Sequence, residues 1–249
     1  MAQISDEPAL VLHVRPYRES SQLVDMLTLH QGRVAALYKG ARRRATPLTT
    51  FATFSASWYG RDGLVTLKAP DSVQALWVAG RAAAGAFYIA ELLMRLLRER
   101  QPVPELFAAA CYTLQQCAAG ASLRLILRPF EWQLLEELGI APDLLTDALT
   151  GAPVVSGAWY AFMTEQGFAL KAEARAAAEE GAAAGDSAAH RWDQGQLLLS
   201  GAALRAIDNR EFSDPAVNAA AQRLFRLLTE PLLGGRALRS RELLQNLRS

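Results

Sequence analysis

The hydrophobic pattern of this chain changes its period once, near residue 80. Residues 9–79 contain short apolar or alternating stretches separated by turn-forming residues. From about Ala82 onward, apolar residues recur every three or four positions, which is the period of an amphipathic helix. One change of period in 249 residues predicts an α+β protein with two domains, a β domain over residues 1–79 and a mainly helical domain over residues 80–249.

The first domain shows the pattern of a small β-barrel. The predicted strands are 9–14, 21–29, 33–39, 51–59 and 64–69. Gly32 lies in the second turn and is suited to a positive φ. Five strands in so short a stretch, with no helical periodicity between them, predict a closed or partly closed barrel of the OB type. An SH3-like barrel has a similar number of strands, and the pattern alone does not distinguish the two.

The second domain is predicted to be mostly helical. The predicted helical stretches are 86–100, 105–118, 123–138, 195–208 and 218–233. Pro129 is interpreted as a first-turn proline that sets the start of the third helix. The section 143–193 is irregular: residues 150–173 predict a small β-hairpin insertion, and the Ala-, Gly- and Glu-rich residues 174–190 predict a mobile surface loop.

The charge is divided along the chain although the net charge is only +1. Lys and Arg minus Asp and Glu give +3 for residues 1–80, +3 for 81–130, −8 for 131–193 and +3 for 194–249. No apolar run is long enough to cross a membrane, and the acidic start MAQISDEPAL lacks the features of a secretory signal. We therefore expect a cytoplasmic protein with no membrane association.

A basic loop is the strongest functional signal. The stretch YKGARRRATP contains Lys39, Arg42, Arg43 and Arg44, and the six basic residues from Arg33 to Arg61 are accompanied by no Asp or Glu. Cations that are not neutralised by neighbouring carboxylates favour phosphate binding, and nearby aromatic residues could stack on bases. The alternative is a solvated charge run that only prevents strand-edge pairing.

A second basic cluster, Arg236, Arg239 and Arg241, lies near the C-terminus. It could extend a nucleic-acid track. Arginines late in a helix can instead satisfy the terminal carbonyl groups, so both interpretations stay open.

The sequence evidence for catalysis is thin. The chain lacks a nucleophile-elbow, Walker or dinucleotide-binding motif. Cys111 and Cys117 are interpreted as reduced core residues, and the three histidines are too dispersed for a local metal site. We expect no enzymatic activity, no cofactor and no metal.

Three stretches, in the same order along the chain, resemble the RecO family of bacterial recombination mediators. These are ALVLHVRPYRESSQLVDMLTLHQGRVAALYKGARR, FYIAELLMRLL and LLTEPLLGGRALRSRELL. The resemblance implies an OB domain followed by a helical domain. It also implies a DNA-repair protein, active in the nucleoid and monomeric when free, that binds single- and double-stranded DNA and anneals complementary strands. With RecR, such a protein would help RecA replace the single-stranded-DNA-binding protein SSB.

The resemblance also implies functional residues. Lys39, Arg42, Arg43 and Arg44, at the KGAR segment, would contact DNA phosphates. Arg15, Arg18 and Arg33 are further candidates on the same barrel.

On the helical domain, the resemblance implies a site for the acidic tail of SSB. Arg128, Leu135 and Leu138 would form it, although Arg128 could equally be a structural partner of Glu131 or Glu136. Many family members carry a four-cysteine zinc site, but LGIAPDLLTDALTGAP has no cysteine. The chain therefore resembles the zinc-free branch, and apolar contacts of Trp159, Tyr160, Phe162 and Phe168 are expected to hold the hairpin.

Two other functional classes fit the same residues. An RNA-binding OB module would use the same loop and aromatic residues. A protein-interaction scaffold would bind SSB and RecR without binding nucleic acid.

Overall fold

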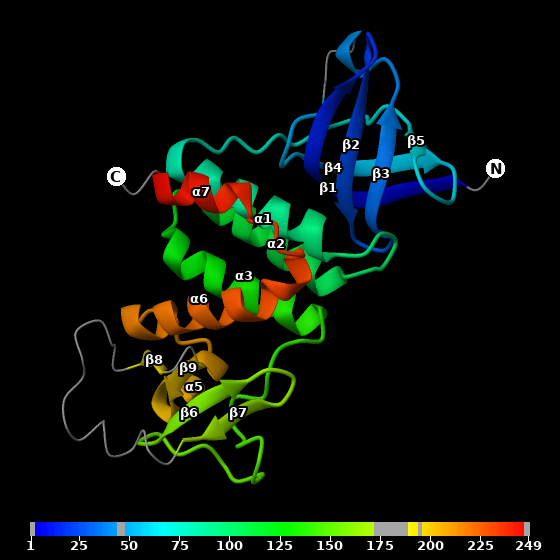
Figure 1. The fold of residues 1–249 in the computed structure, drawn as a ribbon. Coiled ribbons are helices and arrows are strands. Elements are labelled where there is room, and N and C mark those ends of the chain that lie inside the picture. Colours follow the sequence, from blue (N-terminus) through cyan, green and yellow to red (C-terminus); the bar gives the residue numbers. More distant parts are fainter. Residues whose placement is uncertain (1–2, 44–47, 172–188, 194–195, 247–249) are drawn as a thin grey trace. The chain divides into compact units, whose positions relative to one another are not determined.

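The structure, a computed structural model, describes residues 3–43, 48–171, 189–193 and 196–246 (Figure 1). It divides into two compact units. The barrel unit comprises residues 1–126 and 233–249, and the sheet unit comprises residues 127–232. The C-terminal segment therefore returns to the unit that contains the N-terminus, so the sheet unit is inserted between two parts of the barrel unit.

Five strands close into a barrel. They are β1 (Gln3–Tyr17), β2 (Ser21–Thr28), β3 (Gly32–Tyr38), β4 (Thr53–Tyr59) and β5 (Val65–Leu67). The strand order is β1-β2-β3-β5-β4, and β4 pairs back with β1. All neighbouring pairs are antiparallel except β3 and β5, which are parallel. The predicted OB-type barrel and the α+β fold class are confirmed.

The alternation of side chains along the strands fills the barrel. Val24, Met26, Tyr38, Ala56 and Trp58 are all buried in one apolar core. Outward positions on the same strands are more polar, as expected for strands with one buried face. β1 is longer than predicted because its first residues pair with β4 while its later residues pair with β2.

Helices pack on the outside of β1 in the barrel unit. The helices are α1 (Gly80–Leu96), α2 (Pro104–Ala118) and α7 (Arg239–Asn246), and α1 contacts α2, α7 and β1. Leu10 and Leu12 on β1 are buried without belonging to the barrel core. The ring of Phe51, in the turn before β4, lies 5.1 Å from that of Phe87 on α1. The barrel is thus apolar on part of its outer surface as well as inside.

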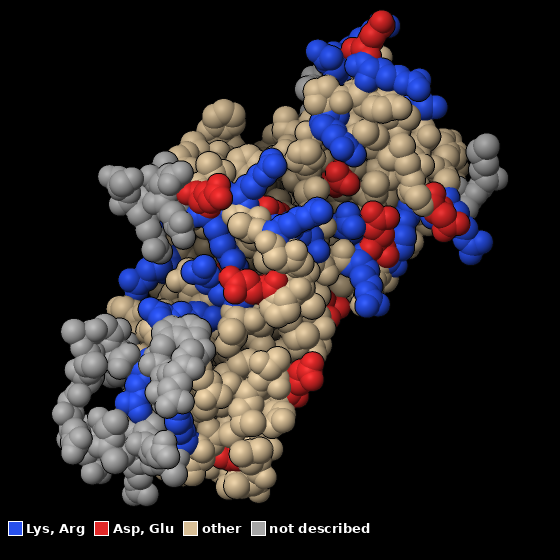
Figure 2. Space-filling view, in the orientation of Figure 1, with Lys and Arg blue, Asp and Glu red and all other residues tan. Residues whose placement is uncertain are grey.

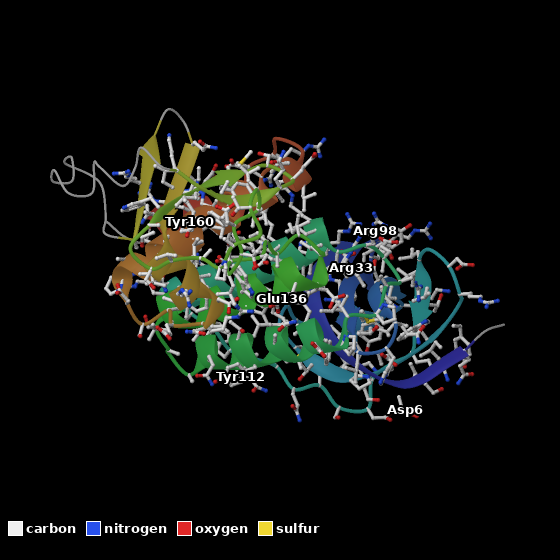
Figure 3. All side chains as sticks on the ribbon, turned by 90° about the horizontal axis from the view of Figure 1, so that it is seen from below. Asp6, Arg33, Arg98, Tyr112, Glu136 and Tyr160 are labelled. Carbon is white, nitrogen blue, oxygen red and sulfur yellow. The ribbon has the colours of Figure 1, made fainter. Side chains whose placement is uncertain are left out.

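A close backbone approach joins the β2–β3 turn to the segment after α1. Gly32 has a φ of +65°, as predicted, and a side chain there would overlap the backbone of Gln101. The Arg33 side chain donates to the carbonyl of Leu97 and forms an ion pair with Glu99 at 3.3 Å. Figure 3 shows Arg33 and Arg98 in this region. Only glycine fits here, because it adopts a positive φ readily and has no Cβ that would meet the backbone of Gln101.

The sheet unit contains a four-stranded sheet with helices. Its strands are β6 (Trp159–Met163), β7 (Gly167–Leu170), β8 (His190–Asp193) and β9 (Gln196–Ser200), in the order β7-β6-β9-β8. The helices are α3 (Leu123–Glu137), which begins in the barrel unit, α5 (Gly201–Asp208) and α6 (Pro215–Thr229). Two short 3-10 turns complete the described elements, η1 (Ala41–Arg43) and η2 (Pro231–Leu233).

Two sequence predictions in this unit are wrong. Residues 196–200 form β9 instead of helix, because the leucines of QLLLS pair between β6 and β8 and Ser200 caps the start of α5. Pro129 lies inside α3 and does not set its start. Phe130 and Leu134 on this helix are buried, and such packing offsets the hydrogen bond that a proline removes.

The predicted β-hairpin is present as β6 and β7. Tyr160, Phe162 and Phe168 are buried, and the rings of Phe162 and Phe168 lie 5.3 Å apart. Trp159 is only half-buried, and the guanidinium group of Arg191 lies 4.5 Å from its ring. Most of the predicted mobile loop, residues 174–188, lies outside the described residues.

Candidate nucleic-acid interface

The end of β1, the β1–β2 turn and the segment that follows β3 meet at one end of the barrel. Tyr17 at the end of β1 pairs with Ser21, and Gln22 on β2 pairs with Tyr38 at the end of β3. The β1–β2 turn and the segment that follows β3 therefore leave the barrel at the same end. The backbone N–H of Arg42 donates to the carbonyl of Ser20 at 3.0 Å, which fixes the two segments side by side.

This arrangement gathers basic side chains. We define the basic end of the barrel as five exposed residues: Arg15, Arg18, Lys39, Arg42 and Arg43. Figure 2 shows blue side chains gathered over this end of the barrel, with one acidic patch among them. The β1–β2 turn contributes Glu19, whose backbone carbonyl accepts a hydrogen bond from the Arg42 guanidinium group at 3.4 Å.

The basic end keeps its charges available. Within the part of the chain that the structure describes, none of its five residues forms an ion pair with a carboxylate. Arg18 lies over the ring of Tyr17, 5.3 Å from its centroid. The loop itself is anchored because Ala41 is fully buried in the barrel core, so Arg42 and Arg43 project from a fixed turn. Exposed cations held in this way can contact the phosphates of a polyanion.

Two of the predicted phosphate contacts are not part of this group. Arg33 lies at the other end of β3, and its guanidinium group is committed to Leu97 and Glu99. Arg44 lies outside the described residues.

Lys68 was missed by the sequence reasoning. Because β5 runs parallel to β3 and Leu67 pairs with Tyr38, Lys68 follows its strand at the same level as Lys39. Its ammonium group lies 4.6 Å from the ring centroid of Tyr59, which is 41% exposed. A parallel pairing of distant strands leaves no local sequence signal, so this neighbour could be found only in the folded chain.

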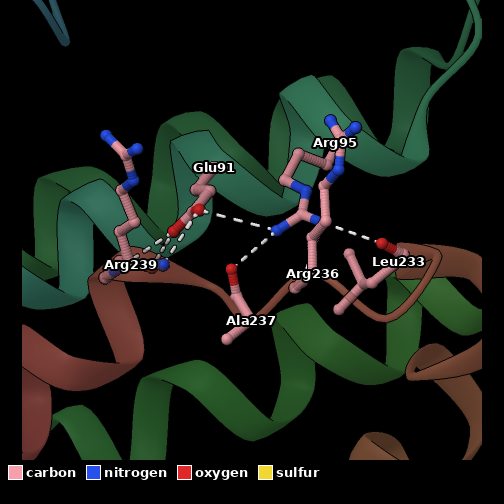
Figure 4. A network of polar contacts seen from close by, with 7 residues as sticks. Glu91, Arg95, Leu233, Arg236, Ala237 and Arg239 are labelled. Carbon is pink, nitrogen blue, oxygen red and sulfur yellow. Dashed lines mark hydrogen bonds and ion pairs between the residues drawn. The ribbon is translucent and has the colours of Figure 1, made fainter.

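Two side chains of α1, Glu91 and Arg95, form a polar clamp that holds the segment with the C-terminal arginines (Figure 4). Arg95 donates to the carbonyl groups of Leu233, Arg236 and Ala237 at 2.8 to 3.0 Å. Glu91, one turn earlier, accepts hydrogen bonds from the backbone N–H groups of Arg239 and Ser240. These contacts fix the backbone of the segment that carries the arginines.

The C-terminal arginines were interpreted either as part of a nucleic-acid track or as partners of carbonyl groups at a helix end. The position of α7 and the clamp bear on this choice. Arg239 and Arg241 lie in the first turn of α7, where they cannot satisfy carbonyl groups at the end of that helix. Arg236 and Arg239 are exposed, and Figure 4 shows both side chains extending away from the segment, whereas Arg241 is half-buried. Arg95 supplies the contacts to the carbonyl groups instead.

The two units differ in net charge more strongly than the consecutive sections of the sequence do. The barrel unit has 18 Lys and Arg against 10 Asp and Glu, a formal net charge of +8. The sheet unit has 8 against 15, a net charge of −7. The basic end and the C-terminal arginines therefore belong to the same strongly positive unit, which favours binding to a polyanion.

Arg128, proposed for the SSB tail, is buried in the structure. Its guanidinium group lies 2.7 Å from the carboxylate of Glu131, and both side chains are almost inaccessible. Leu135 is fully buried and Leu138 is half-buried. This pairing favours the structural role of Arg128 that the sequence had left open.

The residues of the sheet unit do not fit a four-thiolate metal site. The segment 138–153 has no cysteine, and within the described ranges no three His, Cys, Asp or Glu side chains gather as metal ligands. The buried carboxylate of Asp147 instead accepts hydrogen bonds from the backbone N–H groups of Leu149, Thr150 and Leu170. Burial would raise the pKa of Asp147, but these hydrogen bonds outweigh it and lower the pKa.

The two cysteines are free and lie on α2. Burial raises the pKa of Cys111 and of Cys117 to about 11, so both thiols are protonated at neutral pH. None of the helices in the described ranges is long and apolar enough to span a membrane.

Comparison with known proteins identifies relatives along the whole chain. Residues 1–76 match the family described as "Recombination protein O N terminal", and residues 79–242 match "Recombination protein O C terminal". A protein named DNA repair protein RecO from Pseudomonas paraeruginosa is 38% identical over 95% of this chain and 93% of its own length. Proteins of the same name are 36% identical in Nitrosococcus oceani, over 97% of this chain and 93% of their own length, and 37% identical in Pseudomonas aeruginosa, over 99% and 97%. The chain therefore belongs to the RecO family.

Proposed function

We propose that the chain is a DNA-binding recombination mediator whose basic end contacts DNA phosphates. The observation that carries the proposal is the gathering of five exposed cations, from three chain segments, at one end of an OB-type barrel in a unit with a net charge of +8. The names of the relatives, all DNA repair proteins, support a role in DNA repair and recombination.

The proposed mechanism is non-covalent. Annealing requires two polyanions to approach each other, so a protein that promotes it must screen phosphates without reading the bases. Arg42 and Arg43 on the anchored loop, together with Lys39, supply such contacts. The C-terminal pair Arg236 and Arg239 would lengthen the track within the same unit.

The proposed partners follow from the family. We propose that the chain binds single- and double-stranded DNA and acts with RecR to assist RecA on DNA covered by SSB. Arg128 and its surroundings stay the proposed contact for the SSB tail. Because Glu131 already pairs with Arg128, the carboxylate groups of that tail would have to compete with Glu131 for the guanidinium group.

A salt series tests the phosphate contacts. In the variant Lys39→Ala/Arg42→Ala/Arg43→Ala, the slope of log affinity for duplex DNA against log salt should become shallower by about 2.7, since each contact contributes about 0.9. The matched control is Arg61→Ala/Arg98→Ala, two exposed arginines of the same unit away from the basic end. An equal change of slope per replaced cation in both variants would show that net charge, and not the basic end, determines binding.

Strand annealing on complementary oligonucleotides covered with SSB tests the mediator function. The wild-type protein should accelerate duplex formation, and the triple variant should do so weakly at the same salt concentration. Competition with RNA of the same sequence distinguishes an RNA-binding module. A folded wild-type protein that binds an SSB-tail peptide but no DNA would instead indicate a scaffold.

A further inference from the structure

Trp77 is the most exposed of the large apolar side chains in the described residues. It lies in the connector between β5 and α1, and 87% of its surface is accessible. Tryptophan is usually well buried even where it is not completely enclosed. Within the described ranges, Trp77 makes no hydrogen bond and no contact with another ring or with a cation. No packing role therefore explains the position of this side chain.

The connector holds Trp77 outward on an anchored backbone. Gln74 exchanges two backbone hydrogen bonds with Thr53, at 2.9 and 3.0 Å. The next residues alternate: Leu76 and Val78 are half-buried, whereas Ala75, Trp77 and Ala79 are exposed. This alternation is that of an extended chain, in which successive side chains point to opposite sides. The flanking alanines are too small to cover the indole ring, in keeping with its high exposure.

The charge around this position favours an anionic ligand. Residues 72–90 contain no Asp or Glu, and Arg81 in the first turn of α1 is exposed. Trp77 also belongs to the barrel unit, which carries the basic end and the net charge of +8. A flat, exposed aromatic face in a positively charged unit, on a stretch of chain without Asp or Glu, suits an unpaired nucleobase on a phosphate backbone.

We propose that Trp77 stacks on an unpaired base and gives the protein a preference for single-stranded over duplex DNA. The inference rests on the proposed DNA-binding function and extends it, because the basic end alone would contact the phosphates of both forms. Bases inside a duplex are stacked on each other and offer no free face. Annealing therefore removes the contact with Trp77, and the annealed product is bound more weakly than the separate strands.

The test compares two oligonucleotides that differ only in their bases. Fluorescence anisotropy is measured with labelled oligothymidylate and with an abasic oligonucleotide of the same length, at one salt concentration. Trp77→Ala should reduce the affinity for oligothymidylate about 5- to 140-fold, the range for loss of one stacked base. It should leave the affinity for the abasic strand and the slope of the salt series unchanged. Trp77→Phe should recover part of the loss.

The matched control is Tyr112→Ala. Tyr112 projects from α2 in the same unit (Figure 3) and is 61% exposed, but it is not predicted to meet DNA. Circular dichroism and urea midpoints establish that the variants are folded, as expected for exposed positions. Equal losses for the two oligonucleotides, or an equal loss in Tyr112→Ala, would overturn the inference, as would an unchanged affinity of Trp77→Ala for oligothymidylate.

The same titrations distinguish the two proposals. If the wild-type protein binds both oligonucleotides equally and Trp77→Ala changes neither affinity, the stacking role fails while the phosphate-binding function stands. If the wild-type protein binds neither strand, both proposals fail.

Discussion

The basic end of the barrel unit and the sheet unit use the same charged residue types in opposite ways. In the barrel unit, Lys39, Arg42 and Arg43 stand on a fixed loop and form no ion pair with a described residue. In the sheet unit, Arg128 pairs with Glu131, and Arg210 pairs with Glu136 beside the ring of Trp132. The difference shows that the number of arginines does not identify a binding surface. What matters is whether each guanidinium group is already paired with a carboxylate of the protein.

The units also differ in how their turns are held. The β2–β3 turn of the barrel unit depends on the absence of a side chain at Gly32, which lets two backbone segments approach. The loop before β6 in the sheet unit instead depends on a side chain, because the carboxylate of Asp147 accepts its backbone hydrogen bonds. Substitutions at these two positions should therefore damage one unit each.

The largest effect is expected for Gly32→Ala. The new methyl group must overlap the backbone of Gln101, and the φ of +65° adds strain, so we expect a loss of about 3 to 4 kcal/mol in the free energy of unfolding. Urea unfolding measures it. Gly63→Ala, with a similar φ but open space around it, is the control and should lose about 1 kcal/mol. Equal losses would show that strain, and not the close approach, determines the cost.

Asp147→Ala should destabilise the sheet unit by about 3 kcal/mol, because three backbone N–H groups lose their acceptor. DNA affinity, which we assign to the barrel unit, should stay at the wild-type value in conditions where the protein is folded. Asp143→Ala, which removes an exposed carboxylate that accepts a hydrogen bond from the backbone N–H of Leu145, serves as the control. A loss of DNA affinity in folded Asp147→Ala protein would contradict the assignment of separate roles to the two units.

The sequence predicted the elements well and their partners poorly. Periodicity located the five strands and the first three helices, since alternation and the 3.6-residue period are local properties. The stretch QLLLS was assigned wrongly because a short apolar run fits either a strand or a helix until its neighbours are known. The roles of three arginines depend on contacts that the sequence did not reveal. Arg33 pairs with Glu99, and Arg128 pairs with Glu131. The backbone of Arg42 is held by Ser20, which leaves its side chain without a carboxylate partner among the described residues.

A tenfold loss of DNA affinity is expected for Arg236→Ala/Arg239→Ala if the C-terminal arginines extend the DNA track. Each phosphate contact contributes roughly a factor of eight at about 0.1 M salt, and we allow for incomplete contact at one of the two positions. Anisotropy with duplex DNA measures the loss. Arg223→Ala/Arg226→Ala, on α6 of the acidic sheet unit, is the comparison. An equal loss in both pairs would mean that the division of charge between the units does not guide binding.

The smallest effect should be a pH dependence confined to strong acid. The folded pKa of Asp147 lies below its ordinary value of 3.8, so its carboxylate stabilises the sheet unit fully above that pH. The contribution is lost as the pH falls through the lowered pKa. Asp147→Asn should therefore unfold with a flatter dependence on pH below 4 than the wild-type protein, as followed by circular dichroism. Parallel curves would assign the acid sensitivity to other carboxyl groups.

The return of residues 233–249 to the barrel unit affects how the chain is made. During synthesis on the ribosome, the five strands and α1 emerge early. The backbone groups that contact Glu91 and Arg95 lie near the C-terminus and are synthesised last. Until translation ends, one face of α1 lacks its neighbour α7, whereas the inserted sheet unit can already fold. A chain cut short before the last codons would have its acidic sheet unit complete and its basic barrel unit open to proteases.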